Sequence, residues 1–140
     1  MSPFERRIAN TFEDLSAAMQ ECTDALDQAG IPPDAVFAAN LVLEELITNT
    51  IKYGYDEEGP REIAFLVAAD GEKMTIEIID DGHPFDPFHQ EPPDLTLPIE
   101  ERPIGGLGLH LVKNTMDEYV YRRESEKNIV RLSKSLAPRE

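Results

Sequence analysis

Residues 33–54 read PDAVFAANLVLEELITNTIKYG, and the pattern of this stretch predicts a helix in the core of the fold. Its apolar residues fall on more than one side of a helix: Ala38, Leu41 and Val42 on one side, Val36, Leu43 and Ile47 on another. A helix that is apolar on several sides must be buried. We expect a largely buried helix from about Pro33 to Lys52, because proline suits a first turn and Gly54 favours a helix end.

The apolar pattern of the segment before this helix predicts another helix, which is amphipathic. Between Thr11 and Ala29, apolar residues recur at spacings of three and four: Phe12, Leu15, Met19, Cys22 and Leu26. This spacing is typical of a helix with one buried face, and Gly30 then ends it. The preceding segment, Phe4 to Asn10, is interpreted as an edge strand.

The chain after this helix changes to the alternating pattern of strands. Two strands, Arg61–Ala69 and Lys73–Ile79, are predicted to form a hairpin through the Asp70-Gly71 turn. A third helix, Leu107 to about Met116, and two closing strands, Tyr119–Arg123 and Asn128–Ser135, complete the pattern. Helices packed on one side of a sheet predict an α+β two-layer sandwich, here a single domain over residues 1–140.

Composition limits the classes of partner. The 140 residues include 28 Asp and Glu against 13 Lys and Arg, which gives a formal net charge of −15 and a pI near 4.5. Such a surface disfavours binding to nucleic acid or to an anionic membrane. The single cysteine, Cys22, cannot form an internal disulfide and is expected in the core. No apolar run approaches a membrane span, so we expect a cytoplasmic protein.

Glu45 and Asn49 are four residues apart and share a face of the predicted buried helix. Polar groups on such a face need partners. In one interpretation Glu45 pairs with Lys52 or a backbone group, and Asn49 forms hydrogen bonds with polar groups of a loop. In the other, Glu45 handles a proton and the Asn49 oxygen binds a hard metal such as Mg²⁺. The pair alone leaves both open.

Two glycine-containing segments add further candidates. The run IIDDGHPFDP, residues 78–87, places Asp80 and Gly82 at the end of a strand, either as an ordinary turn or as a contact for a flat ring with an amine. The run GGLGLHLV, residues 105–112, opens the third helix, either as a plain hinge or as an anion site at the helix N-terminus. Between them, about residues 83–106 hold six of the eleven prolines and are predicted to form a lid.

Taken in order, these segments resemble the nucleotide-binding boxes of the GHKL superfamily of ATP-binding proteins, and most of all the anti-sigma-factor serine/threonine kinases. The phrases that carry the resemblance are EELITNTIKYGY, DDGHPFDP and GGLGLHLVKNTMDEYVYRR. The resemblance implies a Bergerat-type fold, with a mixed, mostly antiparallel sheet covered on one face by three helices. It extends over essentially the whole chain.

The resemblance also implies roles for individual residues. Glu45 matches the general base and Asn49 the Mg²⁺ ligand. Asp80 matches the aspartate that binds the adenine amine, with Gly82 beside the ring. The cofactor-binding set is completed by the phosphate-binding lid residues and their neighbours: Gly105, Gly106, Leu107 and Gly108. The family often has a glycine entering the last strand; here the segment is Glu126-Lys127-Asn128, which leaves open whether Asn128 contacts the base.

The function implied is that of an ATP-binding, Mg²⁺-dependent anti-sigma regulator with serine/threonine protein kinase activity. Its substrate would be a STAS-type anti-anti-sigma protein, with a sigma factor as a further partner and self-association into a homodimer also implied. The alternative is a non-catalytic module that sequesters its partner in a nucleotide-dependent way. A sensor histidine kinase domain is disfavoured, because His83, His89 and His110 all lie in or after the Asp-Gly loop.

Overall fold

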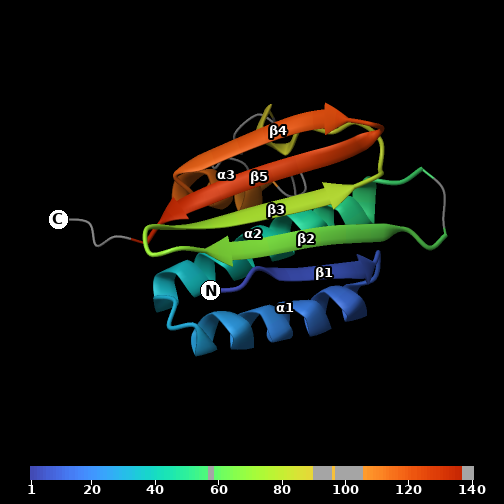
Figure 1. Cartoon of the computed structure of the whole chain (residues 1–140). Coiled ribbons are helices and arrows are strands. Elements are labelled where there is room, and N and C mark those ends of the chain that lie inside the picture. Colours follow the sequence, from blue (N-terminus) through green and yellow to red (C-terminus); the bar gives the residue numbers. More distant parts are fainter. Residues whose placement is uncertain (57–58, 90–95, 97–105, 137–140) are drawn as a thin grey trace.

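Figure 1 shows a computed structural model of the chain, which describes residues 1–56, 59–89, 96 and 106–136. The elements are β1 (Phe4–Ala9), α1 (Phe12–Gln28), α2 (Pro33–Tyr53), β2 (Glu62–Ala69), β3 (Lys73–Asp80), the short 3-10 helix η1 (Pro87–His89), α3 (Gly106–Thr115), β4 (Glu118–Glu124) and β5 (Lys127–Ser135). Every helix and strand predicted from the sequence is present, with boundaries shifted by only one or two residues.

The five strands form one sheet in the order β1-β2-β3-β5-β4. All four pairings are antiparallel, so the expectation of a mixed sheet is corrected. The reason lies in the last hairpin. The connection through α3 does join two parallel strands, β3 and β4, but β5 turns back between them and pairs antiparallel with both. The same pairing sets Asp80 directly opposite Asn128.

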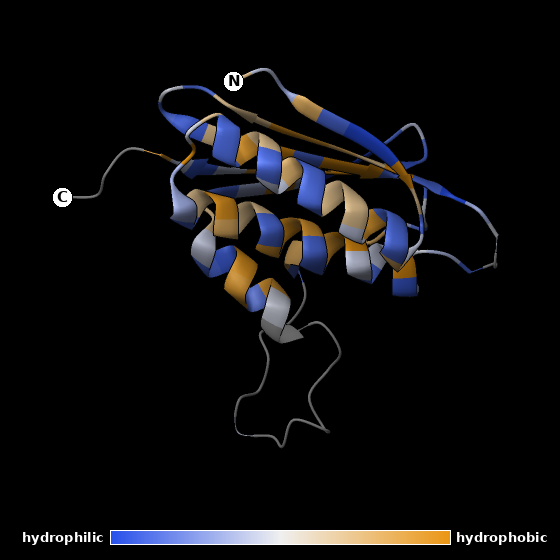
Figure 2. Ribbon diagram, turned by 90° about the horizontal axis from the view of Figure 1, so that it is seen from below, coloured by the Kyte–Doolittle hydropathy of each residue, from blue (hydrophilic) through white to orange (hydrophobic). Residues whose placement is uncertain are grey.

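The three helices lie side by side over one face of the sheet, and no described helix covers the other face (Figure 2). Alternation along the central strands sends every second side chain into this layer: Ile63, Phe65 and Val67 of β2, and Met74, Ile76 and Ile78 of β3. Helix α2 supplies Val42, Leu43 and Ile47, each fully buried. The predicted α+β two-layer sandwich is therefore confirmed.

Local capping explains where α1 begins and ends. The hydroxyl of Thr11 accepts a hydrogen bond from the Asp14 amide at 3.2 Å, which is the usual N-cap arrangement. At the other end, Gly30 has φ 74°, and the Ile31 amide donates to the Leu26 carbonyl at 3.1 Å. This is a Schellman motif, which needs a residue at ease with positive φ. Cys22 is 1% exposed on the buried face of the helix, as predicted.

The predicted lid is described only in part. Residues 90–95 and 97–105 lie outside the described residues. Where loop had been expected, residues 87–89 form η1, because the Phe88 ring is buried against Tyr119 of β4 with ring centroids 4.8 Å apart. This contact ties the start of the predicted lid to the edge of the sheet.

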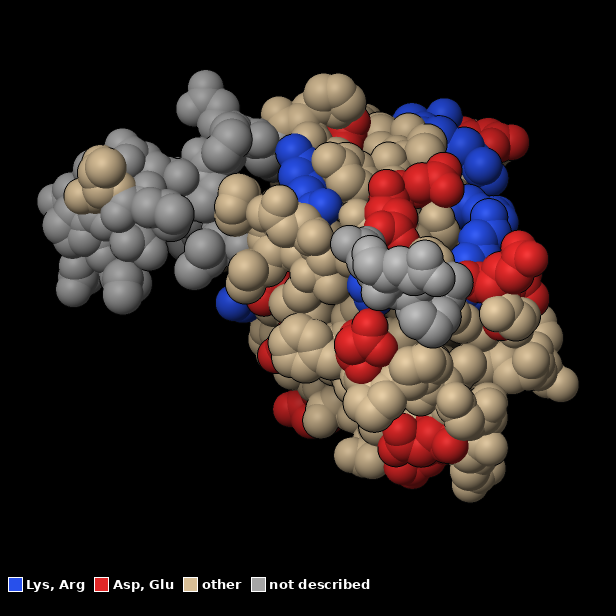
Figure 3. Space-filling view, turned by 90° about the vertical axis from the view of Figure 1, so that its left-hand side faces the viewer, with Lys and Arg blue, Asp and Glu red and all other residues tan. Residues whose placement is uncertain are grey.

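Charges on the end of the molecule seen in Figure 3 are of both signs, with the basic side chains in separate groups among acidic and uncharged ones. Within the described part of the chain, none of the helices combines the length and apolarity needed to cross a membrane.

Candidate functional site

The candidate site is centred on the C-terminal half of α2, which contacts the start of α3 and the segment that follows β3. Gly108 of α3 lies so close to α2 that a Cβ atom on it would overlap the Glu45 carboxylate. Gly82, which follows β3, packs against the backbone of Gly54 at the end of α2 in the same way. Two of the predicted glycines therefore allow close approach to the helix that carries Glu45 and Asn49.

Glu45 and Asn49 lie on one face of α2 and are half-buried. Burial is the main cause that raises the pKa of Glu45, the neighbouring Glu44 carboxylate raises it further, and Lys52 lowers it. Neither side chain forms a hydrogen bond or ion pair with another described residue. Lys52 therefore acts on Glu45 through its charge without a direct ion pair among the described residues, and both polar groups remain available to a ligand.

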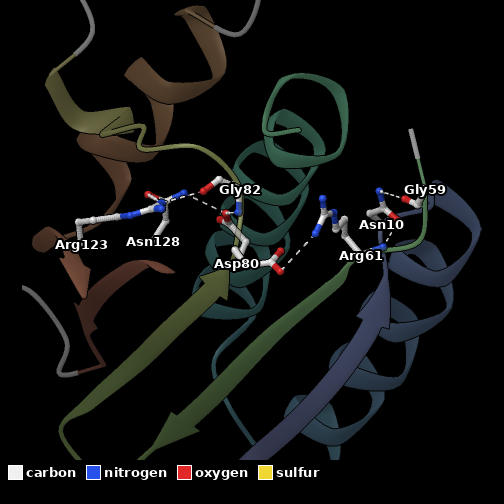
Figure 4. Close-up of polar contacts among 8 residues, drawn as sticks. Asn10, Gly59, Arg61, Asp80, Gly82, Arg123 and Asn128 are labelled. Atoms are coloured by element: carbon white, nitrogen blue, oxygen red, sulfur yellow. Dashed lines mark hydrogen bonds and ion pairs between the residues drawn. The ribbon is translucent and has the colours of Figure 1, made fainter. Parts of the chain in front are cut away.

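Asp80 is 7% exposed at the end of β3, and its carboxylate is held by short hydrogen bonds. Its Oδ1 accepts from the Gly82 amide at 2.9 Å and from Asn128 Nδ2 at 2.9 Å (Figure 4). No hydrogen bond joins Asp80 to Asn49 among the described residues.

Asn128, for which the family resemblance left a contact with the base open, forms hydrogen bonds with both β4 and the loop after β3. It is 5% exposed, and its Oδ1 accepts from the Tyr121 hydroxyl at 2.7 Å, from Arg123 Nη1 at 3.1 Å and from the Phe85 amide at 3.4 Å. Its Nδ2 donates to the His83 carbonyl as well as to Asp80. The available signal was the strand register, which pairs residue 80 with residue 128 but could not be read from periodicity.

The loop after β3 is fixed to α2 through its backbone. The His83 amide donates to the Gly54 carbonyl at 2.9 Å, and His83 Nε2 lies 2.6 Å from the Tyr53 carbonyl oxygen. Beside this loop is an open polar hollow of about 660 Å³, whose lining includes Tyr55, Asp81, Gly82 and Arg123 but not Asn49 or Asp80.

Tyr55 follows α2 and carries a buried hydroxyl with no hydrogen-bond partner among the described residues. Burial raises the pKa of this hydroxyl, and the negative charges of Asp80 and Asp81 raise it further. Arg61 lies 5.7 Å from the centre of the Tyr55 ring and 3.9 Å from Asp81, a contact that the dashed line from Arg61 marks in Figure 4. The tyrosine is thus kept neutral beside the Asp-Gly loop.

The remaining predicted residues are only partly placed. Gly106 and Leu107 begin α3, as expected for a helix N-terminus at the site, whereas Gly105 lies outside the described residues. No group of three His, Cys, Asp or Glu side chains able to hold a metal occurs in the described part of the chain. A metal held here would therefore need most of its ligands from a bound molecule or water.

Comparisons with known proteins show the family of this chain. The family model of the histidine kinase-like ATPase domain matches residues 8–134. The serine-protein kinase RsbW of Staphylococcus aureus is 30% identical over 128 residues, which cover 86% of this chain and 79% of that protein. The RsbW of Halalkalibacterium halodurans is 30% identical over 103 residues, which cover 71% of this chain and 62% of that protein.

A solved structure, that of the RsbU and RsbW domains of Rv1364c from Mycobacterium tuberculosis, has the same fold. Its TM-score is 0.69 at 12% identity, over 97% of this chain and 32% of that one. The chain thus spans less than two thirds of this structure and of the Halalkalibacterium relative. The family model covers nearly the whole chain, and the chain covers 79% of the 30% identical Staphylococcus aureus relative. The chain therefore belongs to the histidine kinase-like ATPase domain family, and the relatives that it matches are named serine-protein kinase RsbW.

Proposed function

We propose that this chain binds ATP with Mg²⁺ and transfers the γ-phosphoryl group to a serine or threonine of a STAS-type anti-anti-sigma protein. The observation that carries the proposal is the juxtaposition of Glu45 and Gly108. The carboxylate of a buried helix lies against the first turn of α3, whose N-terminal amides favour an anion such as a phosphate. In this proposal a proton acceptor thus lies beside the helix N-terminus that would hold the phosphates.

In this proposal Glu45 accepts the proton of the attacking hydroxyl. A base works best when its pKa approaches the working pH, and burial shifts the pKa of Glu45 in that direction. Its freedom from partners in the described chain leaves the carboxylate able to reach a substrate hydroxyl. In phosphoryl transfer, positioning and electrostatics supply most of the rate.

The nucleotide base would bind at the end of β3. Gly82 removes side-chain bulk there, and Asp80 presents an acceptor to the exocyclic amine of adenine. The residues also fit a metal carried by the nucleotide: the unpaired Asn49 amide would supply one oxygen, and the nucleotide phosphates and water would supply the others. Mg²⁺, when bound, would neutralise charge on the phosphates.

The finer parts of the proposal rest on family membership. They are the STAS-type substrate, a sigma factor as second partner, self-association into a homodimer, and the action of residues 1–140 as one cytoplasmic domain with a lid over about 83–106. The RsbW relatives are named serine-protein kinases, which supports transfer to a serine.

Glu45→Gln and Glu44→Gln form a matched pair for the test, since the two glutamates are adjacent and only Glu44 is exposed. We expect Glu45→Gln to bind ATP as the wild type does and to transfer phosphoryl groups about 10²–10⁴-fold more slowly. Glu44→Gln should remain active.

The assay uses radiolabelled ATP and the STAS-type proteins of the source organism, with calorimetry for nucleotide binding. Phosphoryl transfer at the normal rate by Glu45→Gln would show that Glu45 is not the general base. A wild type that binds ATP and a STAS protein without transfer would instead be the partner-sequestering module.

A further inference from the structure

The side chain of Asn128 has no hydrogen-bonding capacity left for a ligand. Its amide group has two N–H donors, and both are used, on Asp80 Oδ1 and on the His83 carbonyl, each at 2.9 Å. Its oxygen accepts from Tyr121, Arg123 and the Phe85 amide. A carbonyl oxygen offers two lone pairs, so three donors saturate it. These partners also fix which way the amide faces.

We infer that Asn128 is a positioning residue: it orients the Asp80 carboxylate and does not itself contact the nucleotide base. Tyr121 and Arg123, both on β4, hold Asn128 in turn. The hairpin of β4 and β5, at the edge of the sheet, thereby sets the base preference of the site. This inference rests on the proposed function, because it concerns the base of the proposed nucleotide.

Asn128 can influence base preference because the two oxygens of the Asp80 carboxylate have different roles. Oδ1 already accepts from the Gly82 amide and from Asn128, which fixes the plane of the carboxylate. The other oxygen is then held in one direction as an acceptor for a donor on the base. An acceptor in a fixed position favours the 6-amino group of adenine and disfavours a 6-carbonyl, whose oxygen would face it without a hydrogen bond.

Arg123 links this network to the loop as well as to Asn128. Its Nη1 donates to the Gly82 carbonyl at 2.7 Å while lying 3.1 Å from Asn128 Oδ1. The same guanidinium therefore contacts both residues that donate hydrogen bonds to Asp80, each through its carbonyl oxygen (Figure 4). Loss of the Tyr121 hydroxyl, which does not line the hollow beside the loop, would loosen the carboxylate without removing any group from the site itself.

Tyr121→Phe, Asn128→Ala and Asp80→Asn test this network, with Tyr119→Phe as the control. Tyr119 lies on the same strand, and its hydroxyl forms no hydrogen bond with another described residue. Dissociation constants are measured for ATP and for inosine triphosphate, which carries a carbonyl in place of the 6-amino group. The wild type should prefer ATP.

We expect Tyr121→Phe to weaken ATP binding roughly three- to tenfold, the loss that one buried hydrogen bond implies, and Asn128→Ala to weaken it further. Inosine triphosphate affinity should stay constant in both, and Tyr119→Phe should bind like the wild type. In the Asp80→Asn background, Asn128→Ala should have little added effect, because residues that act through one another are not additive.

A measurement without nucleotide checks the same network. The Gly82 amide donates to Asp80 Oδ1, so its NMR resonance should move in Tyr121→Phe and Asn128→Ala and stay in place in Tyr119→Phe.

Additive effects of Asp80→Asn and Asn128→Ala would overturn the inference in favour of direct base contact. If Asn128→Ala weakened the binding of ATP and of inosine triphosphate equally, Asn128 would have only a structural role. A wild type that binds neither nucleotide overturns the proposed function itself, and base selection with it. If the Gly82 amide resonance stayed in place in Tyr121→Phe and Asn128→Ala, the positioning network would be refuted, whatever the nucleotide affinities were.

Discussion

Replacing Gly82 by alanine forces a methyl group into a contact between two backbone segments. A Cβ on Gly82 would overlap the carbonyl oxygen of Gly54 and lie 3.0 Å from Asp80 Oδ1. Gly82 is not among the residues with positive φ, so the requirement for glycine here is one of space. The obstructing atom belongs to the end of α2 and cannot move aside like the tip of a flexible side chain.

The cost follows from two losses. Overpacking of this kind costs about 1–3 kcal/mol. Separating the segments also weakens the hydrogen bond from the His83 amide to the Gly54 carbonyl, worth about 0.5–1.5 kcal/mol. We therefore expect a loss of about 2–4 kcal/mol in the free energy of unfolding, which for 140 residues corresponds to a fall in Tm of about 7–14 °C.

Thermal unfolding followed by circular dichroism measures this directly, with Gly71→Ala as the matched control. Gly71 lies in the turn between β2 and β3, and a Cβ there meets nothing within 4 Å. Its substitution should change stability by less than about 0.5 kcal/mol. If Gly82→Ala melts within about 2 °C of the wild type, as the control should, the packing of Gly82 against Gly54 has been misjudged.

Three further predictions concern stability and reactivity. Tyr55→Phe should raise the stability of the ligand-free protein by about 1 kcal/mol, because it removes a buried hydroxyl that has no partner among the described residues; a lower Tm would contradict this. Ser125 and Glu126 both have positive φ, 51° and 64°, in the two-residue turn between β4 and β5. Changing them together to Asn-Gly should stabilise by about 1–2 kcal/mol, measured by urea unfolding, and an unchanged midpoint would argue against strain in this turn. Burial raises the pKa of Cys22 from 9.0 to about 11, so the native thiol should resist a disulfide reagent at pH 8 until the protein unfolds. The stabilisation from this neutral thiol is present below pH 9 and is lost as the pH rises towards 11; immediate labelling of the native protein would refute its burial.

Much of the fold was predictable from the sequence because its signals are local. A period of three to four residues marks α1, and alternation marks β2 and β3. Gly30 at the end of α1 and Pro33 at the start of α2 act through the backbone of their own segments. Such signals need no knowledge of the rest of the chain, so element boundaries were placed to within one or two residues.

The candidate site was predictable only as a set of residues. Their types and order led to Glu45, Asn49, Asp80, Gly82 and the glycines of α3, and the roles of these residues stay predictions. The contact of Gly108 with Glu45 and the packing of Gly82 against Gly54 could not be predicted, because both depend on how α2 is placed against segments far away in the chain.

What the sequence alone determined is therefore the list of helices and strands, the faces they bury and the family to which the chain is similar. What only the tertiary structure decided is the position of β5 between β3 and β4, and with it the hydrogen bond between Asp80 and Asn128, 48 residues apart. Periodicity records which side of each element is apolar. It does not record which strand pairs with which, because that choice depends on the packing of all the elements together.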